Sequence, residues 1–211
     1  METILRVDNI VKSYGSAFKF GPVSLDVHAG EVIALMGPNG AGKTTLIRLI
    51  TGLLQKDSGK VESQGMSSKK TKKLYIGYMS EAISIWDDLE VKHQLAFMAD
   101  LYRVQIPDEI TDLVHLLGLD KYMNVRGSHL SQGNRRKLSL ILSILHDPEI
   151  LVLDEPFNGL DSISRKNTIQ WIRDRVNKQD KPRAVIIASH QLEGLESFFD
   201  RLVVLKDGAL S

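Results

Sequence analysis

The stretch that decides the fold is EVIALMGPNGAGKTTLIRLI, residues 31–50. Residues 32–36 form a short run that is apolar on both faces, as expected of a buried central strand. Glycines interrupt this pattern between 37 and 42, and leucine and isoleucine then recur at helical spacing over 43–54. GPNGAGKTT (37–45) matches G-x-x-x-x-G-K-S/T and lies between strand and helix, the context that this motif requires. The stretch therefore predicts a strand, a phosphate-binding loop and a helix.

The residue types in this loop suit a nucleoside triphosphate. Glycines let backbone N–H groups converge on phosphate oxygens, and the helix that follows adds the partial positive charge of its N-terminus. Lys43 is predicted to reach the β- and γ-phosphates, Thr44 to offer its hydroxyl to Mg²⁺, and Thr45 to assist at the α-phosphate. The alternative is a tight glycine turn that happens to precede Lys-Thr. The predicted contacts come from Gly37, Pro38, Asn39, Gly40, Ala41, Gly42, Lys43, Thr44 and Thr45.

Two adjacent carboxylates follow a second apolar run. ILVLDE (150–155) places Asp154 and Glu155 at the C-terminal edge of a predicted buried strand, where ligands bind in open α/β sheets. Asp154 suits an indirect role at Mg²⁺, either through a bound water or by contacting one of the metal's ligands. Glu155 is placed to polarise the water that attacks the γ-phosphate. The alternative is a strand that simply ends in charged residues at the surface.

Two further side chains are candidates for the same site. His190 follows the run AVIIAS (184–189), again at a strand end, and is predicted to contact the γ-phosphate, although a lone histidine is often structural. Tyr14 in VKSYG is predicted to stack on adenine, whereas aromatic residues near strand ends also serve as core.

The rest of the chain predicts one α/β domain. Strand-like runs at 4–14 and 23–30 indicate an N-terminal antiparallel β region, and helical periodicity fills 83–146. Short apolar runs then alternate with helical stretches, which favours a mostly parallel sheet flanked by helices. These runs are 150–155, 184–189 and 201–208, and the helical stretches between them are 162–177 and 191–199. We therefore expect a single domain over 1–211. Its core spans 1–81 and 148–211, and an inserted α-helical subdomain spans 82–147.

Composition excludes several classes of protein. The 211 residues carry 27 Lys and Arg against 26 Asp and Glu, a net charge of +1, so no nucleic-acid partner is expected. Cysteine is absent, which excludes disulfides and thiolate chemistry. No signal peptide is visible, and the apolar runs are far shorter than the roughly 20 residues of a membrane helix. The basic run SSKKTKK (67–73) is interpreted as a solvated loop or as a contact for phosphate or a membrane surface.

GPNGAGKTT, LSQGN, ILVLDEP and ASH occur in this order and spacing over essentially the whole chain, which therefore resembles the ATP-binding subunit of ABC transporters, a P-loop NTPase. The resemblance implies ATP hydrolysis with ATP and Mg²⁺ bound. It implies adenine stacking by Tyr14, a Mg²⁺-associated role for Asp154, a catalytic role for Glu155 and a switch role for His190. Asp161, in the loop 158–161, would act across a dimer.

The resemblance also implies partners. In this family two ATP-binding chains pair head to tail, so that the signature turn of one chain contacts the ATP held by the other. The matching residues here are Ser131, Gln132 and Gly133. A second ATP-binding chain, identical or different, and a membrane-spanning permease subunit are therefore expected. The chain would lie in the cytoplasm, peripheral on the inner face of the cell membrane.

Two departures from the family pattern bear on function. The signature, usually LSGGQ, here reads LSQGN, so that Gln132 and Asn134 replace a glycine and a glutamine. Where the family usually carries a glutamine, IGYMSE offers Glu81, which looks like the exporter-type, ABC-2-like drug-resistance branch. We expect Glu81 to remain a metal or water ligand coupled to the membrane partner. The apolar residues 83–86 either form a groove for that partner's coupling helix or cap the helical core.

Three functions remain in competition at this point. An ATPase subunit that powers transport, in particular export, accounts for all the motifs. A soluble ABC-type ATPase that remodels a protein or nucleic-acid complex is the second, although its relatives usually fuse two ATP-binding domains or insert long coiled coils. A regulatory nucleotide-binding module with little catalysis is the third, and Glu155 and His190 argue against it.

Overall fold

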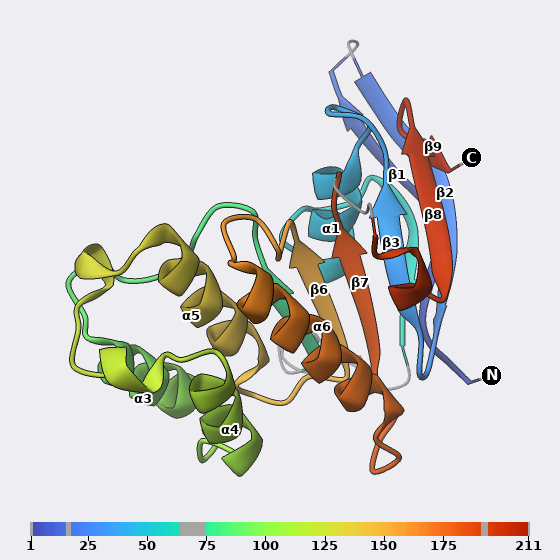
Figure 1. Cartoon of the computed structure of the whole chain (residues 1–211). Coiled ribbons are helices and arrows are strands. Elements are labelled where there is room, and N and C mark those ends of the chain that lie inside the picture. The colour runs from blue at the N-terminus through green and yellow to red at the C-terminus, as the bar shows by residue number, and fades with distance from the viewer. Residues whose placement is uncertain (1, 16–17, 64–74, 191–193, 211) are drawn as a thin grey trace.

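The computed structural model describes residues 2–15, 18–63, 75–190 and 194–210. The basic run at 67–73 lies outside these residues. The described chain forms two sheets and a group of helices (Figure 1). The strands of the large sheet are, in spatial order, β5 (Ile76–Met79), β6 (Ile150–Asp154), β7 (Ala184–Ala188), β3 (Val32–Met36), β8 (Arg201–Lys206) and β9 (Ala209–Leu210).

The strands β5, β6, β7, β3 and β8 are parallel, and only β9 runs antiparallel, against β8. The carboxyl ends of β3, β5, β6 and β7 therefore meet at one edge of the sheet, the edge at which open α/β sheets bind ligands. The second sheet is antiparallel, with β1 (Thr3–Tyr14) between β2 (Phe18–His28) and β4 (Ser58–Glu62). This arrangement confirms the predicted fold class.

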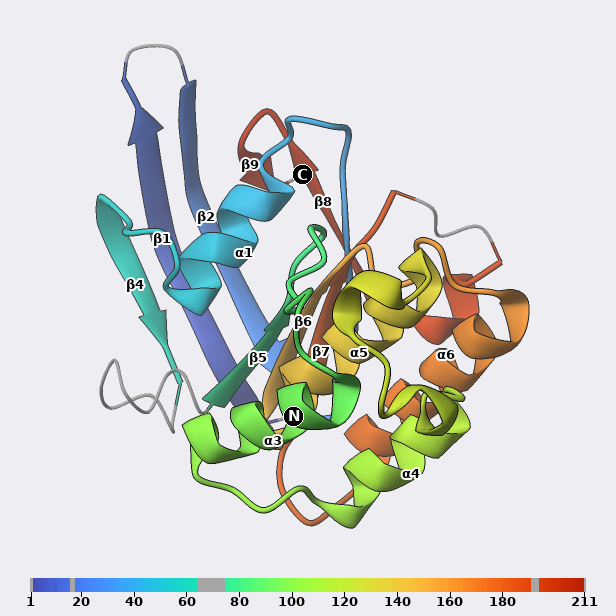
Figure 2. The same ribbon diagram turned by 90° about the vertical axis from the view of Figure 1, so that its left-hand side faces the viewer.

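The helices are α1 (Lys43–Thr51), α3 (Val91–Tyr102), α4 (Asp108–Leu116), α5 (Gln132–Ile144) and α6 (Ser162–Asn177). Figure 2 shows α1 between the antiparallel sheet and the large sheet, and α3 to α6 together on the other side of the large sheet. Three short 3-10 helices complete the described structure, at Asp120–Tyr122, Gly127–His129 and Glu196–Phe198.

Local chemistry sets the ends of these helices. Ser131 caps α5 by accepting a hydrogen bond from the Asn134 N–H, and Asp161 caps α6 by accepting one from the Ser164 N–H. The predicted helix at 162–177 coincides with α6. The helix predicted over 43–54 ends earlier, at Thr51, because Gly52 adopts the left-handed conformation that closes helices. The helix predicted at 191–199 is wrong in its described part, which holds only the single turn Glu196–Phe198.

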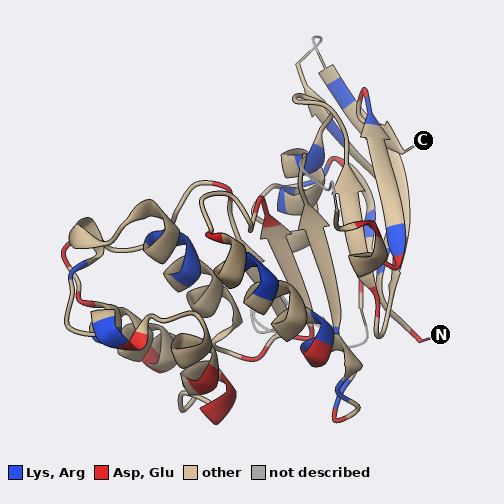
Figure 3. Ribbon diagram, viewed as in Figure 1, with Lys and Arg blue, Asp and Glu red and all other residues tan. Residues whose placement is uncertain are grey.

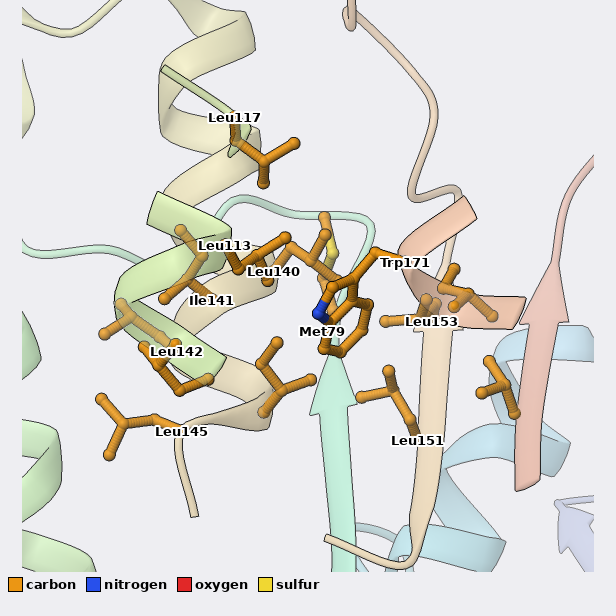
Figure 4. Packing of buried hydrophobic residues seen from close by; sticks show 14 of the residues in the cluster. Met79, Leu113, Leu117, Leu140, Ile141, Leu142, Leu145, Leu151, Leu153 and Trp171 are labelled. Carbon is orange, nitrogen blue, oxygen red and sulfur yellow. The ribbon is translucent and has the colours of Figure 1, made fainter. Parts of the chain in front are cut away.

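The buried side chains form two cores, one on each face of the large sheet. Because side chains alternate along a strand, Ile33 and Leu35 enter the core around α1, whereas Val32 and Ala34 face α3 to α6. Figure 4 shows the second core, in which Leu151 and Leu153 of β6 lie with Trp171 of α6 and the leucines of α5. Apolar runs without alternation in β3, β6 and β7 are thus explained by burial on both faces.

The predicted helical region contains α3, α4 and α5. It shares its core with the sheet, because α5 packs against β5 as well as against α3 and α4. The division into a core of 1–81 and 148–211 and a subdomain of 82–147 stays a prediction.

One buried histidine makes the stability of the fold depend on pH. His146 follows α5, is 8% exposed, and stacks on Tyr102 with ring centroids 4.1 Å apart. Burial lowers the pKa of His146 from 6.5 to about 4. The unfolded chain therefore binds a proton between pH 6.5 and 4 that the folded chain does not. The contribution of His146 to stability is complete above pH 6.5 and is lost as the pH falls towards 4.

We expect acidification across this window to cost the folded state about 3 kcal/mol through His146 alone. His146→Phe keeps a ring against Tyr102 but cannot titrate, so its free energy of unfolding should fall less on acidification than that of the natural chain. Denaturant unfolding of both proteins at several pH values measures the difference. Parallel curves between pH 4 and 6.5 would show that His146 is not the group responsible.

Candidate active site

The phosphate loop needs glycine at two of its positions. Gly37 (φ 150°) and Gly42 (φ 104°) have backbone angles that other residues rarely adopt. A Cβ at Gly37 would lie 2.3 Å from the Leu205 carbonyl oxygen, and one at Gly42 would lie 2.7 Å from the Phe20 ring. The loop after β3 is therefore packed against β8 and β2, and its shape depends on the absence of side chains there.

Lys43, the first residue of α1, points back over this loop. Its ammonium nitrogen donates to the carbonyl oxygens of Gly37 (2.6 Å) and Pro38 (3.1 Å), and the Ala41 N–H donates to the Pro38 carbonyl (3.1 Å). The cation thus lies at the centre of a closed loop at a helix N-terminus. The positive charge of the lysine, the backbone N–H groups of the loop and the N-terminal end of the helix dipole all act at this place. Together they favour a bound anion such as the phosphates of a nucleotide.

A pocket of about 380 Å³ opens beside the loop. It brings together residues that follow four strands of the large sheet, as expected when the carboxyl ends of parallel strands share an edge. It contains most of the residues predicted from the sequence, and also Phe18, which was not predicted. The lining residues are Tyr14, Phe18, Asn39, Gly40, Gly42, Lys43, Thr44, Thr45, Glu81, Asp154, Glu155 and His190.

Asp154 has the features of a metal-associated carboxylate. It is 3% exposed, and its Oδ2 has no hydrogen-bond partner among the described residues. Burial and the negative charges of Glu81 and Glu155 raise its pKa to about 6, against the opposing effects of Lys43 and Thr44. A buried carboxylate oxygen without a partner is costly unless a cation or donor completes the site.

The donors in the pocket fit Mg²⁺ as a partner of a bound nucleotide. The described residues contain no cluster of three or more His, Cys, Asp or Glu side chains arranged to hold a metal by themselves. Mg²⁺ commonly takes one or two protein ligands together with phosphate oxygens and water. Thr44, Asp154 and Glu81 are the side chains in this pocket whose oxygens would serve that purpose.

Glu155 is held rigidly at the back of the pocket. Its Oε1 accepts from the His190 N–H (3.0 Å) and lies 2.7 Å from His190 Nδ1, and its Oε2 accepts from the Ser189 hydroxyl (3.0 Å). Its own N–H donates to the Ala188 carbonyl, and its φ of 51° is unusual for a residue with a side chain. Strained conformations of this kind persist where the surrounding contacts fix them, often at functional sites.

His190 and Tyr14 both line the pocket. The His190 side chain is half exposed on the pocket side of Glu155. The Tyr14 hydroxyl lies 3.5 Å from Thr45 Oγ1, and its ring is 43% exposed beside Phe18, with centroids 6.3 Å apart. The aromatic pair forms an exposed apolar edge to the pocket. Phe18 was not predicted as a site residue, because it belongs to no recognised motif and its sequence context indicates only the start of a strand.

The signature turn does not line the pocket of its own chain. Ser131 and Gln132 are exposed, and Gly133 packs so closely on the 158–161 loop that a Cβ there would lie 2.8 Å from the Gly159 carbonyl oxygen. Asp161 is likewise outside the pocket. Hydrogen bonds from Ser164 lower its pKa to about 2, and Lys137 lies 3.5 Å from it. The structure thus separates Ser131, Gln132, Gly133 and Asp161 from the other predicted site residues.

A second hollow, of about 310 Å³, lies beyond Glu81. Trp86, 40% exposed, packs edge-on against Phe97 with centroids 5.1 Å apart, and Ile85 packs against the core. Residues 83–86 thus contribute both to the core and to an exposed surface. None of the described helices is long and apolar enough to cross a membrane. The hollow is lined by Leu53, Tyr78, Ser80, Ser84, Trp86, Met98, Tyr102, Ser139, Leu142 and Ser143.

The chain is similar to proteins of a known family. Residues 20–158 match the family model described as "ABC transporter". An uncharacterised ABC transporter ATP-binding protein of Methanocaldococcus jannaschii is 32% identical over 212 residues, a match that covers 99% of this chain and 76% of that protein. A sulfate/thiosulfate import ATP-binding protein of Mesostigma viride is 31% identical, with 97% of this chain and 60% of that protein covered.

A solved structure of an ATP-binding subunit of an ABC transporter has the same fold. It superposes with a TM-score of 0.89 at 25% identity, covering 99% of this chain and 88% of that one. The family match spans the phosphate loop, the signature turn and the Asp154–Glu155 pair, and the structure places the first and the last of these in one pocket. The chain therefore belongs to the ABC transporter family, as an ATP-binding subunit that hydrolyses ATP.

Proposed function

We propose that this subunit hydrolyses MgATP at a site shared between two ATP-binding chains paired head to tail, and that it powers export through a separate membrane subunit. The observation that carries the proposal is the position of the signature turn. Ser131 and Gln132 are exposed, lie at the N-terminus of α5, and are absent from the lining of the pocket that holds Lys43 and Glu155. A second chain is the natural source of these donors for the bound phosphates.

Within the pocket, each side chain has a distinct task. Lys43 and the N–H groups of the loop bind the β- and γ-phosphates, and the Tyr14 ring offers a face for the adenine. Thr44, Asp154 and Glu81 would hold Mg²⁺, which when bound neutralises charge on the phosphate oxygens. The buried Oδ2 of Asp154, which has no hydrogen-bond partner in the described part of the chain, supports this assignment.

Glu155 orients the attacking water and accepts its proton. Two contacts from His190 and one from Ser189 fix the carboxylate, so that little reorganisation accompanies the reaction. His190, half exposed beside Glu155, contacts the γ-phosphate and senses its release. The contact between His190 and Glu155 thereby ties the state of the nucleotide to the position of the base.

The surface beyond Glu81 is the proposed contact for the membrane subunit. Trp86 and Phe97 give this surface an exposed aromatic edge. Ser80 and Ser84 line its hollow, and Glu81, which follows Ser80 in the chain, lines the ATP pocket. Exposed apolar surface rimmed by polar groups is typical of a protein interface. The subunit would then lie in the cytoplasm against the inner face of the membrane. The proposed direction, export, is inferred from the glutamate at position 81. The similar protein of Mesostigma viride is by its name an import ATP-binding protein, so the direction is part of the proposal.

The size of a hydrolysis-deficient variant in solution tests the shared site. Glu155→Gln keeps the shape of the side chain and should let ATP accumulate between two chains. We expect its mass to double when ATP and Mg²⁺ are added, and to return to that of one chain after the nucleotide is removed. Light scattering coupled to size exclusion measures the mass. A protein that binds ATP and remains a single chain would contradict pairing between two copies.

A further inference from the structure

Arg136 is a buried arginine that no part of the proposed reaction uses. It lies on α5, five residues after Ser131, within the basic segment of that helix coloured blue in Figure 3. Its side chain is 4% exposed, and Nη1 donates to the carbonyl oxygens of Ser80 (3.3 Å) and Glu81 (2.9 Å). Its Nε has no hydrogen-bond partner among the described residues. A buried guanidinium without a paired carboxylate is costly, so its position calls for a compensating interaction.

The compensation comes from the charges around the ATP pocket. Burial lowers the pKa of Arg136, whereas the negative charges of Glu81, Glu155 and Asp154 raise it. Arginine keeps its charge at neutral pH under such shifts. Lys43, a cation that lines the same pocket, donates its hydrogen bonds to the phosphate loop. The charge of Arg136 therefore opposes those of the three carboxylates, and the same side chain is hydrogen-bonded to the Glu81 carbonyl oxygen.

The hydrogen bonds of Arg136 also fix the backbone from which Glu81 emerges. One nitrogen bridges the carbonyls of two successive residues, and the Ser80 hydroxyl bonds to the Ala82 carbonyl and lies 3.2 Å from Ser84 Oγ. Glu81 points to the ATP pocket, and Ser80 and Ser84 line the hollow beyond it. The Arg136 side chain of α5 thus fixes the backbone at Ser80 and Glu81, between the ATP pocket and the second hollow.

We propose that Arg136 is a positioning residue for ATP hydrolysis, which fixes the Glu81 peptide and offsets the additional negative charge that glutamate brings to the pocket. This inference rests on ATP binding at the proposed site, and goes beyond it by linking residue 136 to the identity of residue 81. It follows that the importance of Arg136 depends on whether residue 81 is charged.

A double-mutant cycle tests this dependence. In Arg136→Gln we expect kcat to fall about 10- to 100-fold, the range for losing hydrogen bonds to a charged donor, with a smaller change in KM. When residue 81 is already glutamine, Arg136→Gln should lower kcat by a factor at least several-fold smaller than it does in the natural chain. Arg136→Lys, which keeps the charge, should retain more turnover than Arg136→Gln. Equal losses in both backgrounds, with no rescue by lysine, would overturn the proposal and leave Arg136 with a packing role.

ATP affinity without Mg²⁺ gives a second readout that does not depend on turnover. Removing a cation whose charge opposes those of three carboxylates should weaken the binding of the ATP anion in Arg136→Gln, and Glu81→Gln should restore it. Glu81→Gln alone should bind ATP more tightly than the natural chain, so this arm holds even where Arg136→Gln folds poorly. Calorimetry in EDTA measures both. Unchanged affinity in Glu81→Gln and in Arg136→Gln would refute the charge balance.

The neighbouring arginine supplies a matched control. Arg135 pairs with Asp87 (2.6 Å) and the Gly127 carbonyl (2.8 Å), away from both cavities. Arg135→Gln should therefore change kcat and ATP affinity less than twofold. A separate control tests the proposed ATPase site. If that site were wrong, the ATP turnover of the natural chain would not fall in Glu155→Gln.

Discussion

Replacing Glu155 by glutamine should lower ATP turnover about 1000-fold while leaving ATP affinity nearly unchanged. Glutamine has the same shape and keeps an oxygen that can accept from the Ser189 hydroxyl or the His190 N–H, so the pocket should remain intact. It has no lone pair basic enough to take a proton from water. The loss should therefore appear in kcat and in single-turnover rates, and not in the binding of nucleotide.

A carboxylate at the other end of β6 provides the control for this variant. Glu149 directly precedes β6, at the end opposite Asp154 and Glu155, so Glu149→Gln changes charge without touching the pocket. Its turnover should match that of the natural chain. If Glu155→Gln kept more than about a tenth of the natural turnover, Glu155 would not be the base.

Ser131→Arg should lower turnover at least 100-fold while the isolated chain still binds ATP. The reason is the separation seen in the structure: Ser131 is exposed and does not line the pocket of its own chain, so arginine there leaves that pocket free. In a paired site the long cationic side chain would occupy the space of the donors that a second chain contributes, and loss of such a donor costs about 10²–10³ in turnover.

The capping role of Ser131 has to be separated from this effect. Its side chain accepts the Asn134 N–H (3.3 Å), and loss of a helix cap costs about 1 kcal/mol of stability. Ser131→Ala loses the cap without adding bulk, so its denaturant midpoint shows how much of the defect is structural. Equal losses of ATP binding and turnover in Ser131→Arg would mean that the turn only shapes α5.

Mixing two inactive chains gives the sharpest form of the test. Lys43→Ala damages the phosphate loop, and Ser131→Arg damages the turn that would reach the other chain. In a head-to-tail pair of one chain of each kind, one shared site has a natural Lys43 and a natural Ser131. Part of the lost turnover should return on mixing. Two inactive proteins that stay inactive together, although they associate, would place both residues in the site of a single chain.

Local patterns in the sequence predicted most of the residues that line the pocket. The run at 31–50, the acids at 154–155 and His190 each follow or form part of a strand with an unmistakable apolar pattern. Because parallel strands place their carboxyl ends at one edge, these positions already predicted a common pocket, and the structure places Lys43, Asp154, Glu155 and His190 in it. The boundaries of α6 were predictable for a similar reason, since its cap and its periodicity are local.

Tertiary structure decided what local patterns do not encode. The segment 191–199 has apolar residues at helical spacing, yet its described part forms only a single turn, in which Phe198 is buried against the core. Arg136 contacts the pocket region through Glu81, which is far away in the chain and on another element. Phe18 lies beside Tyr14 because β1 and β2 pair in that register.

The sequence by itself determined the motifs, their order and the strand ends at which they lie, because these follow from periodicity and from residue chemistry over a few positions. Only the tertiary structure decided which motifs meet within one chain. It brings Glu81, Asp154 and Glu155 together beside Lys43, and it leaves Ser131 and Asp161 outside that pocket. The physical reason is that contacts between distant segments depend on how helices pack on the sheet, and this packing is set by the whole core at once.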